Sequence, residues 1–345
     1  MTDKPKAIAV ALLSGGLDST LAAKVILEQD ITVIGVNFAG AYCPRPKTGR
    51  SNAEKTAEQL GIELATLPIE ADFIAMVKHP KRSRGKNMNP CIDCHTLMIR
   101  RAWALGQTRG ADFIITGEVL GQRPLSQNRQ SLGVVARDSG VGNRLLRPLS
   151  AKLLDPTEAE QAGLVDRERL FDIEGRSRKR QMELAAQYGI GEYPSPAGGC
   201  LLTEKVFSKR LAEAFDRGED SLEIVELLSL GRHFRLPSGA RLVVGRDEAE
   251  NDELLRRKPA GAVVIDASDL PGPVGSGVQG SRGRGLAAAT PVGQCEDSSD
   301  RITAAGICAR YSDKRKEPAV KVKVAEEETT VQPAGEEETA RLLIA

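Results

Sequence analysis

The chain has 345 residues, with 48 Lys and Arg against 47 Asp and Glu and a formal net charge of +1. This length suggests two or three domains. Because the charges balance, the protein has no overall positive charge to attract a nucleic acid, and any such partner must bind to local basic patches. Six cysteines are too sparse for a disulfide scaffold, and no apolar run approaches the roughly eighteen residues of a membrane span. The short apolar stretch 7–13 runs into a glycine pair rather than a cleavage site. We therefore expect no signal peptide, no membrane partner and a cytoplasmic protein.

The first half of the chain alternates predicted strands and helices. Short apolar runs predict strands, and helical spacing of apolar residues predicts helices. In chain order, these are the strand 7–13, helix 19–29, strand 31–38, helix 51–62, strand 63–69, helix 91–106 and strand 111–119. Ser51 and Glu54 form a capping box that predicts the start of the second helix. The alternation predicts an α/β fold with a doubly wound parallel sheet.

The second half changes in composition. Helices are predicted at 157–162, 174–187 and 204–215, followed by short β-like stretches, Pro/Gly turns and one short helix around 247–257. The tail is acidic and repetitive, which is typical of disorder. We predict four parts: a first domain over 1–150, a helical extension over 151–220, a small α+β domain over 221–325 and a disordered tail over 326–345.

Residues 14–19, SGGLDS, lie between the first predicted strand and the first helix. Such a turn presents backbone N–H groups and the positive end of a helix dipole, which favours a phosphate. Gly15 and Gly16 allow close approach of the backbone, and Ser14 and Ser19 add hydroxyl donors. A carboxylate such as Asp18 beside a phosphate needs Mg²⁺ or a donor between them. The GxxxxGK[ST] and GxGxxG patterns are both absent.

Cysteines form a second motif. NPCIDCHTLMIRRA places Cys91 and Cys94 on the first turn of a helix, and Cys200 lies in SPAGGCLLTEK. Cys43 and His95 are further candidate ligands. Three cysteines suit a [4Fe–4S] cluster in which one iron has no protein ligand. They suit zinc with a fourth ligand nearly as well. A redox dithiol or a plain buried cysteine pair is the alternative.

The glycine motif resembles the pyrophosphate-binding loop of the N-type ATP pyrophosphatases, also called PP-loop enzymes. Four segments in order, PCIDCHTLMIRRA, ITGEVLGQRPLSQN, RPLSAKLL and PSPAGGCLLTE, are similar to the tRNA 4-thiouridine synthetase/thiamine-biosynthesis-like sulfurtransferases of the iron–sulfur-dependent branch. The resemblance covers about residues 7–215. The segment GRHFRLPSGARLVVGRDEAENDELL is similar to the RNA-associated domain of NFACT-type proteins. The resemblance implies an adenine nucleotide alpha hydrolase-like PP-loop fold.

The same resemblance implies a reaction: ATP and Mg²⁺ adenylate a uridine carbonyl oxygen in tRNA, pyrophosphate leaves, and sulfur from a sulfide or persulfide donor replaces the oxygen. In that branch three cysteines hold the cluster, and Cys91, Cys94 and Cys200 match them. The family also places the end of the second strand, here Asn37, near the adenine, and a basic residue, here Lys152, near the activated base.

The segment after the fourth predicted strand carries the remaining candidates, since doubly wound sheets bind ligands at the carboxyl ends of their strands. These candidates are Gly117 and Gln122 for nucleotide binding and Glu118, with Asp18 and Lys152, for catalysis. Cys295 and Cys308 have no partner in the sequence pattern and are interpreted as structural. The oligomeric state, a homodimer included, is left open.

The run KHPKRSRGK, residues 78–86, is a candidate phosphate-binding patch for tRNA, and a solvated loop is the equal alternative. Two other functions compete with thiolation. One is a PP-loop ATP pyrophosphatase with structural zinc that acts as an amide or amine ligase, and the other is a non-catalytic RNA-binding module. We expect no THUMP domain of the standard 4-thiouridine synthetases, so the identity of the uridine and the choice between its C2 and C4 oxygens stay open.

Overall fold

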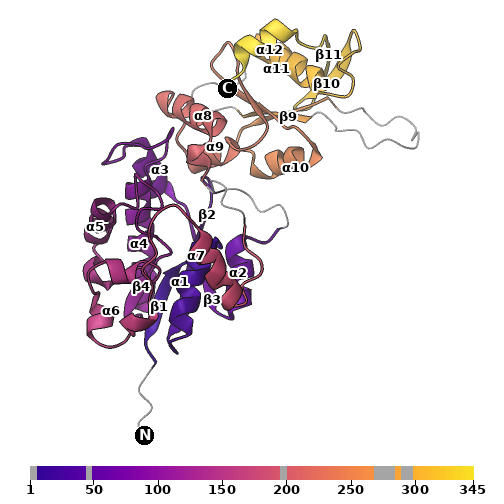
Figure 1. Cartoon of the computed structure of the whole chain (residues 1–345). Coiled ribbons are helices and arrows are strands. Elements are labelled where there is room, and N and C mark those ends of the chain that lie inside the picture. Colours follow the sequence, from indigo (N-terminus) through magenta and orange to yellow (C-terminus); the bar gives the residue numbers. More distant parts are fainter. Residues whose placement is uncertain (1–5, 44–48, 195–199, 268–283, 289–297) are drawn as a thin grey trace. The chain divides into compact units, whose positions relative to one another are not determined.

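The computed structural model describes residues 6–43, 49–194, 200–267, 284–288 and 298–345. The chain folds into two units, Met1–Thr203 and Glu204–Ala345 (Figure 1). The finer predicted bounds at residues 150 and 220 stay predictions. Among the described helices, none is long and apolar enough to cross a bilayer.

The first unit is built on a parallel sheet of five strands in the order β3-β2-β1-β4-β5. The strands are β1 (Ile8–Leu12), β2 (Thr32–Ala39), β3 (Glu63–Pro68), β4 (Phe113–Ile115) and β5 (Leu145–Leu146). This confirms the predicted α/β class with a doubly wound sheet. The order reverses beside β1, so the carboxyl ends of β1 and β4 flank the position where such sheets bind ligands.

Helices cover both faces of this sheet. Alternate residues of β1 point to opposite faces: Ala9 and Ala11 pack in one core cluster with Ile26 of α1, while Val10 contacts Gly106 of α4. The helices of this unit are α1 (Leu17–Leu27), α2 (Asn52–Leu60), α3 (Ala71–Lys78), α4 (Cys91–Thr108), α5 (Arg129–Asp138), α6 (Glu158–Gln161) and α7 (Lys179–Gln187). Short 3-10 turns lie at Gly142–Arg144, Ala151–Leu153, Arg167–Arg169 and Leu201–Thr203.

Several predicted elements differ from the structure. Helices α3 and α5 were not predicted, although Asn128 caps α5 by accepting from the Ser131 N–H group. Strand β4 ends at Ile115 rather than 119, because the chain leaves the sheet there to pack Gly117 against α1. The helix predicted from 174 begins only at Lys179. The capping box of Ser51 and Glu54 is confirmed.

The second unit has an antiparallel sheet of six strands in the order β11-β10-β8-β9-β7-β6. The strands are β6 (Arg232–Arg235), β7 (Arg241–Val244), β8 (Val263–Asp266), β9 (Arg284–Ala288), β10 (Val320–Val324) and β11 (Glu327–Val331). The helices are α8 (Lys205–Asp216), α9 (Leu222–Leu227), α10 (Glu248–Arg257), α11 (Ser298–Arg310) and α12 (Glu336–Leu342). The predicted small α+β domain is present in this unit.

The prediction of a disordered tail over 326–345 is wrong. Strand β11 pairs with β10 along its whole length, and Val331 joins the core cluster of this unit. The acidic residues 336–338 occupy the first turn of α12, where the helix dipole favours negative charge. The acidic composition therefore reflects a helix start rather than a chain that cannot fold.

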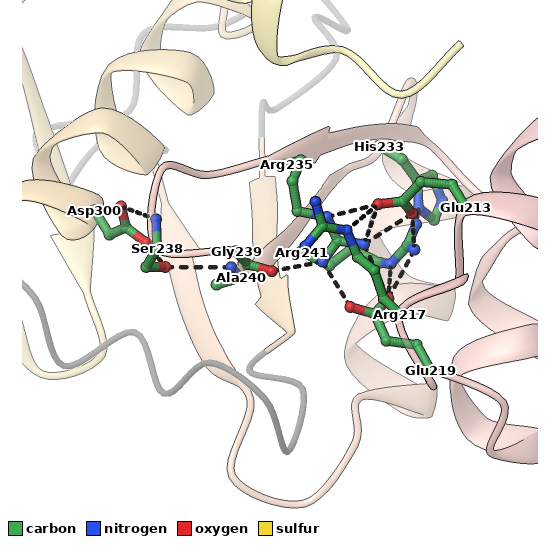
Figure 2. Close-up of polar contacts among 10 residues, drawn as sticks. All are labelled: Glu213, Arg217, Glu219, His233, Arg235, Ser238, Gly239, Ala240, Arg241 and Asp300. Carbon is green, nitrogen blue, oxygen red and sulfur yellow. Dashed lines mark hydrogen bonds and ion pairs between the residues drawn. The ribbon is translucent and has the colours of Figure 1, made fainter. Parts of the chain in front are cut away.

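A buried ion-pair network ties α8 to the β6–β7 hairpin (Figure 2). Arg241, fully buried, binds Glu219 through Nε at 2.8 Å and Glu213 through Nη2 at 2.5 Å. Arg235 binds the same two carboxylates, at 2.9 Å and 2.6 Å. Two arginines thus neutralise two glutamates in the interior, and His233 accepts a further hydrogen bond from Arg241 through Nδ1 at 3.2 Å.

Arg241→Met is expected to destabilise the second unit by about 3–5 kcal/mol, because Arg235 must then compensate two carboxylates without the buried charge of Arg241. Arg217→Met is the control, since Arg217 pairs with the same Glu213 but is 47% exposed and is worth less than about 1 kcal/mol. Hydrogen–deuterium exchange of peptides from β6 and β7 in the full chain measures the difference. Equal protection in the two variants would contradict a stabilising role for the buried network.

Candidate functional site

The glycine loop after β1 leaves the first turn of α1 open to an anion. Gly16 is the N-cap of α1 and makes no side-chain capping bond, so the first N–H groups of the helix keep no side-chain partner there. Gly15 has a φ of +74°, and a Cβ on it would collide with the backbone of Asn52 at the start of α2. Ser14 and Ser19 lie together, with their hydroxyls 3.1 Å apart. The phosphate-binding role of this loop stays a prediction, and the open start of α1 is compatible with it.

The segment after β4 meets this loop directly. A Cβ built on Gly117 would lie 2.5 Å from the backbone nitrogen of Ser19, so only glycine allows this approach. Gln122 donates from Nε2 to Oδ2 of Asp18 at 2.9 Å. The other oxygens of these two side chains, Oδ1 of Asp18 and Oε1 of Gln122, are buried without a hydrogen-bond partner. Orphaned buried oxygens are costly for a protein, and they are the donor atoms that a hard cation such as Mg²⁺ takes.

Gly117→Ala tests this packing. The methyl group must displace the first turn of α1, so we expect ATP binding to weaken at least tenfold and stability to fall by about 1–3 kcal/mol. Gly133→Ala is the control, because Gly133 lies in α5 with open space around its Cα, where alanine is favoured by about 0.5–1 kcal/mol. Calorimetric ATP titration and thermal melting measure both effects. Undisturbed ATP binding in Gly117→Ala would exclude this contact from the site.

Two other predicted residues have different surroundings. Asn37 is half-buried near the end of β2, next to Val36, whose carbonyl accepts from the N–H of Leu13 at 2.8 Å. Asn37 thus flanks the glycine loop. The ammonium of Lys152 instead contacts Glu168, at 2.8 Å to its carbonyl and 3.0 Å to its carboxylate. The structure does not bring Lys152 to Asp18, and its catalytic role stays a prediction.

Glu118 is buried and held by three side chains. Arg147 donates from Nε at 2.9 Å, Thr116 donates its hydroxyl at 3.1 Å, and Nδ1 of His95 lies 2.8 Å from Oε1. Burial opposes ionisation, but the charge of Arg147 and the contacts with His95 outweigh it and hold the pKa of Glu118 at about 2. The carboxylate is therefore occupied in positioning His95. The sequence had singled out His95 only as a candidate ligand, and Arg147 only within the segment RPLSAKLL.

The tertiary structure brings the third cysteine to the CxxC helix. The N–H of Leu201 donates to the carbonyl of Tyr42 at 3.1 Å, and the N–H of Met88 donates to the carbonyl of Leu202 at 3.2 Å. The side chain of Asn87 adds a bond to the carbonyl of Thr203 at 2.8 Å. The residues after Cys200 are therefore fixed between the loop after β2 and the segment before α4.

Four half-buried free thiols gather there, from Cys43, Cys91, Cys94 and Cys200. Burial, followed by the neighbouring thiols of Cys200, Cys91 and Cys43, raises the pKa of Cys94. Burial raises the pKa of Cys200 to about 11, and Cys91 and Cys43 add to the rise. Such mutual repulsion between thiolates is what a bound metal cation relieves.

No group of three His, Cys, Asp or Glu side chains in the described part of the chain already has the spacing of a metal site. The thiols are close enough to affect one another's charge but are not in a ligand geometry. Four thiols are ligands of the kind that zinc and iron–sulfur clusters take. Cys308 is fully buried in the core of the second unit, as expected for a structural cysteine, and Cys295 lies outside the described residues.

Two arginines of the basic run 78–86 bind other groups of the protein. Arg82 pairs with Asp93, in the first turn of α4, and with Asp138. Arg84 donates to the carbonyls of Val77 and Lys78. These two arginines fold the run against the helix that carries the CxxC motif, so they are less available to phosphates than the sequence suggested.

Comparison with known proteins links both units to described families. The model described as "Thiamine biosynthesis protein (ThiI)" matches residues 6–153, and the model described as "NFACT protein RNA binding domain" matches residues 231–342. The tRNA-specific 2-thiouridylase MnmA of Geobacter metallireducens is 30% identical over 273 residues, which cover 71% of this chain and 70% of that protein. The corresponding enzyme of Campylobacter fetus subsp. fetus is 34% identical over 112 residues, which cover 30% of this chain and 32% of that protein.

A solved 4-thiouridine synthetase–RNA complex with bound ATP is 20% identical, with a TM-score of 0.32, and the match covers 53% of this chain and 52% of that one. The chain spans 32% to 57% of the length of four bacterial 2-thiouridylases that it matches. Since the Geobacter metallireducens protein is matched over more than two thirds of both chains, this protein belongs to the PP-loop family of tRNA thiolation enzymes, with a ThiI-type PP-loop domain joined to an NFACT-type domain.

Proposed function

We propose that this protein is an ATP-dependent sulfurtransferase that converts a uridine of tRNA to thiouridine. The observation that carries the proposal is the presence, within one unit, of the glycine loop and a cluster of free thiols. Gly117 packs on the loop, and the next residue, Glu118, contacts His95, which follows Cys94. The relatives named as tRNA 2-thiouridylases support the reaction class. ATP and tRNA are cytoplasmic, and we place the enzyme in that compartment.

ATP binds at the glycine loop in this proposal. The N–H groups at the start of α1 and the hydroxyls of Ser14 and Ser19 bind the pyrophosphate part, and Asn37 lies on the side of the adenine. Asp18 and Gln122 offer the buried oxygens Oδ1 and Oε1 to Mg²⁺. When bound, Mg²⁺ neutralises the charge that develops on the leaving pyrophosphate.

The chemistry proceeds in two displacements. The uracil carbonyl oxygen attacks the α-phosphorus of ATP, the bond to pyrophosphate breaks, and N3 of the base loses its proton as a C=N bond forms. Hydrosulfide then adds to the activated carbon, AMP leaves with the oxygen, and the S–H proton returns to N3. Rate enhancement in the first step rests on positioning and charge neutralisation by the glycine loop.

Cys91, Cys94 and Cys200 would hold a [4Fe–4S] cluster. Such a cluster, held by three cysteines, would supply the sulfur chemistry of the second step by holding the sulfide. The thiols of Cys94 and Cys200, whose pKa values are raised by burial and by neighbouring thiols, fit a site that a cation completes. Cys43 lies within the same cluster, so its role is part of the test.

The RNA reaches this unit through a basic surface and an accessory domain. Lys81 and Lys86 are exposed, and within the described residues neither has an ion-pair partner. The second unit carries the match to an RNA-binding domain. We propose that the second unit contributes affinity for tRNA, while the PP-loop unit carries out the chemistry.

The test combines metal analysis and product analysis. Anaerobically purified protein is expected to contain about four irons and four acid-labile sulfides per chain, and with ATP, sulfide and tRNA to release pyrophosphate and form thiouridine detected by mass spectrometry. One zinc and pyrophosphate release with an amine acceptor would replace thiolation by the ligase alternative. Binding of tRNA without ATP cleavage would make the protein an RNA-binding module and overturn the proposal.

A further inference from the structure

An exposed turn follows Gln122 in the segment between β4 and α5. Its three residues, Arg123, Pro124 and Leu125, are all exposed, and Leu125 is 67% exposed. A single exposed leucine is ordinary on a protein surface, so the meaning of this one depends on how it is held and what surrounds it.

The backbone of the turn is fixed by hydrogen bonds. The carbonyl of Arg123 accepts from the N–H of Gln127 at 2.8 Å. The carbonyls of Pro124 and Leu125 accept side-chain bonds from the start of α5, at 2.8 Å and 3.0 Å. The proline ring also fixes its own φ angle. The side chains of Arg123 and Leu125 therefore project from a firm support, and the backbone carbonyls of the turn already have partners.

The turn lies between the nucleotide loop and the cysteines. The residue before it, Gln122, donates to Asp18 at 2.9 Å. On the other side, burial raises the pKa of the Cys200 thiol to about 11, and the charge of Arg123 lies close enough to oppose that rise. In the proposed reaction the target base meets ATP and sulfide at one place. The nucleotides next to that base therefore come to this turn.

Leu125 also borders the basic run 78–86. A Cβ built on Gly85 would lie 3.2 Å from Cδ1 of Leu125, so the leucine leans over the end of that run. Lys86 is exposed beside Gly85, and within the described residues the charged groups of Lys86 and Arg123 have no ion-pair partner. An apolar tip between two free cations suits RNA, whose phosphates bind the cations and whose bases offer flat apolar faces. A second copy of this chain would bring like charges together at the same contact.

We propose that the turn 123–125 is a tRNA contact in which Leu125 packs on the base next to the target uridine and Arg123 binds the adjoining phosphate. The inference rests on the proposed function, because a base that leaves the RNA stack to react exposes the face of its neighbour. Apolar side chains cover such faces in proteins that unstack nucleic acids. The turn thus keeps the RNA open while the uridine reacts.

The first test measures tRNA thiolation by variants of the apolar tip. Leu125→Ser is expected to lower kcat/KM for tRNA about tenfold, since the buried apolar contact is lost. Leu125→Met keeps an apolar side chain and should recover most of the rate. Leu164→Ser is the control, because Leu164 is an exposed leucine of the same unit that follows α6. ATP affinity, iron content and melting temperature should stay unchanged in all three variants.

The second test follows the neighbouring base itself. A tRNA carries 2-aminopurine on one side or the other of the thiolated uridine, and its fluorescence rises when the base loses its stacking partner. We expect a rise on one side when the wild type binds, and we expect Leu125→Ser to lose it while Leu164→Ser retains it. The same rise with Leu125→Ser would overturn the packing of Leu125 on this base.

The third test addresses the phosphate contact. Arg123→Gln is expected to reduce the slope of log K for tRNA against log salt by about one, whereas Leu125→Ser keeps the slope. Arg109→Gln is the control, because Arg109 follows the last residue of α4, about 27 Å along the helix axis from Cys91. An unchanged slope in Arg123→Gln would overturn the phosphate contact.

Two further outcomes separate this inference from the proposed function. Wild-type thiolation rates in both Leu125→Ser and Arg123→Gln would overturn the inference alone. A dimer of the wild type that Leu125→Ser converts to a monomer, with thiolation unchanged, would assign the turn to a second copy of the chain instead. Failure of the wild type itself to thiolate tRNA would overturn the proposed function.

Discussion

Asp18→Asn is expected to slow tRNA-dependent ATP cleavage by about a hundredfold to a thousandfold. Asparagine keeps an oxygen for the hydrogen bond from Gln122, so the loop keeps its shape. The amide NH₂ group then takes the place of the buried, unpartnered Oδ1, and the side chain loses its negative charge. The position is therefore a poor ligand for a cation. Pyrophosphate release at several Mg²⁺ concentrations measures the effect, and excess Mg²⁺ is expected to restore part of the rate.

Asp30→Asn provides the matched control. Asp30 is exposed and has a φ of 60°, a left-handed conformation that asparagine also adopts readily. This variant should cleave ATP like the wild type. Similar rates in the two variants, or a loss in Asp18→Asn that comes with unfolding, would remove Asp18 from the proposed cation site.

Cys94→Ser is expected to reduce iron from about four per chain to less than about one and to lower thiolation more than about a hundredfold, the size of effect seen when a single key catalytic group is removed. A serine hydroxyl stays protonated and is a poor ligand for iron, whereas a thiolate is a good one. ATP affinity should persist, because the glycine loop is unchanged. Iron and sulfide analysis, with thiouridine measured by mass spectrometry, tests both parts.

Two further cysteine variants sharpen this result. Cys308→Ala is the control, since Cys308 is buried in the second unit and should leave the iron content unchanged. Cys43→Ser decides between three and four protein ligands: retained iron supports the three-cysteine site, and loss of iron would make Cys43 a ligand. Iron retained in Cys94→Ser would contradict the cluster as proposed.

Local patterns in the sequence determined most of the first unit. The glycine loop at 14–19, the capping box at Ser51 and the helix that opens on Cys91 depend on hydrogen bonds between residues a few positions apart, which a sequence displays directly. The strand–helix rhythm likewise determined the parallel sheet. The acidic composition of residues 326–345 led to the wrong prediction of disorder, because a run of glutamates is typical both of a disordered tail and of the first turn of a helix.

Only the tertiary structure decided what the individual residues can do. The strand order β3-β2-β1-β4-β5 brings Gly117 and Gln122 to Asp18, and backbone bonds to Leu201 and Leu202 bring Cys200 to the CxxC helix. The same packing placed Glu118 against His95 and Arg147, and Lys152 against Glu168. These contacts join residues far apart in the chain, where the free energy of burial and charge pairing in the folded state, rather than local propensity, selects the partner.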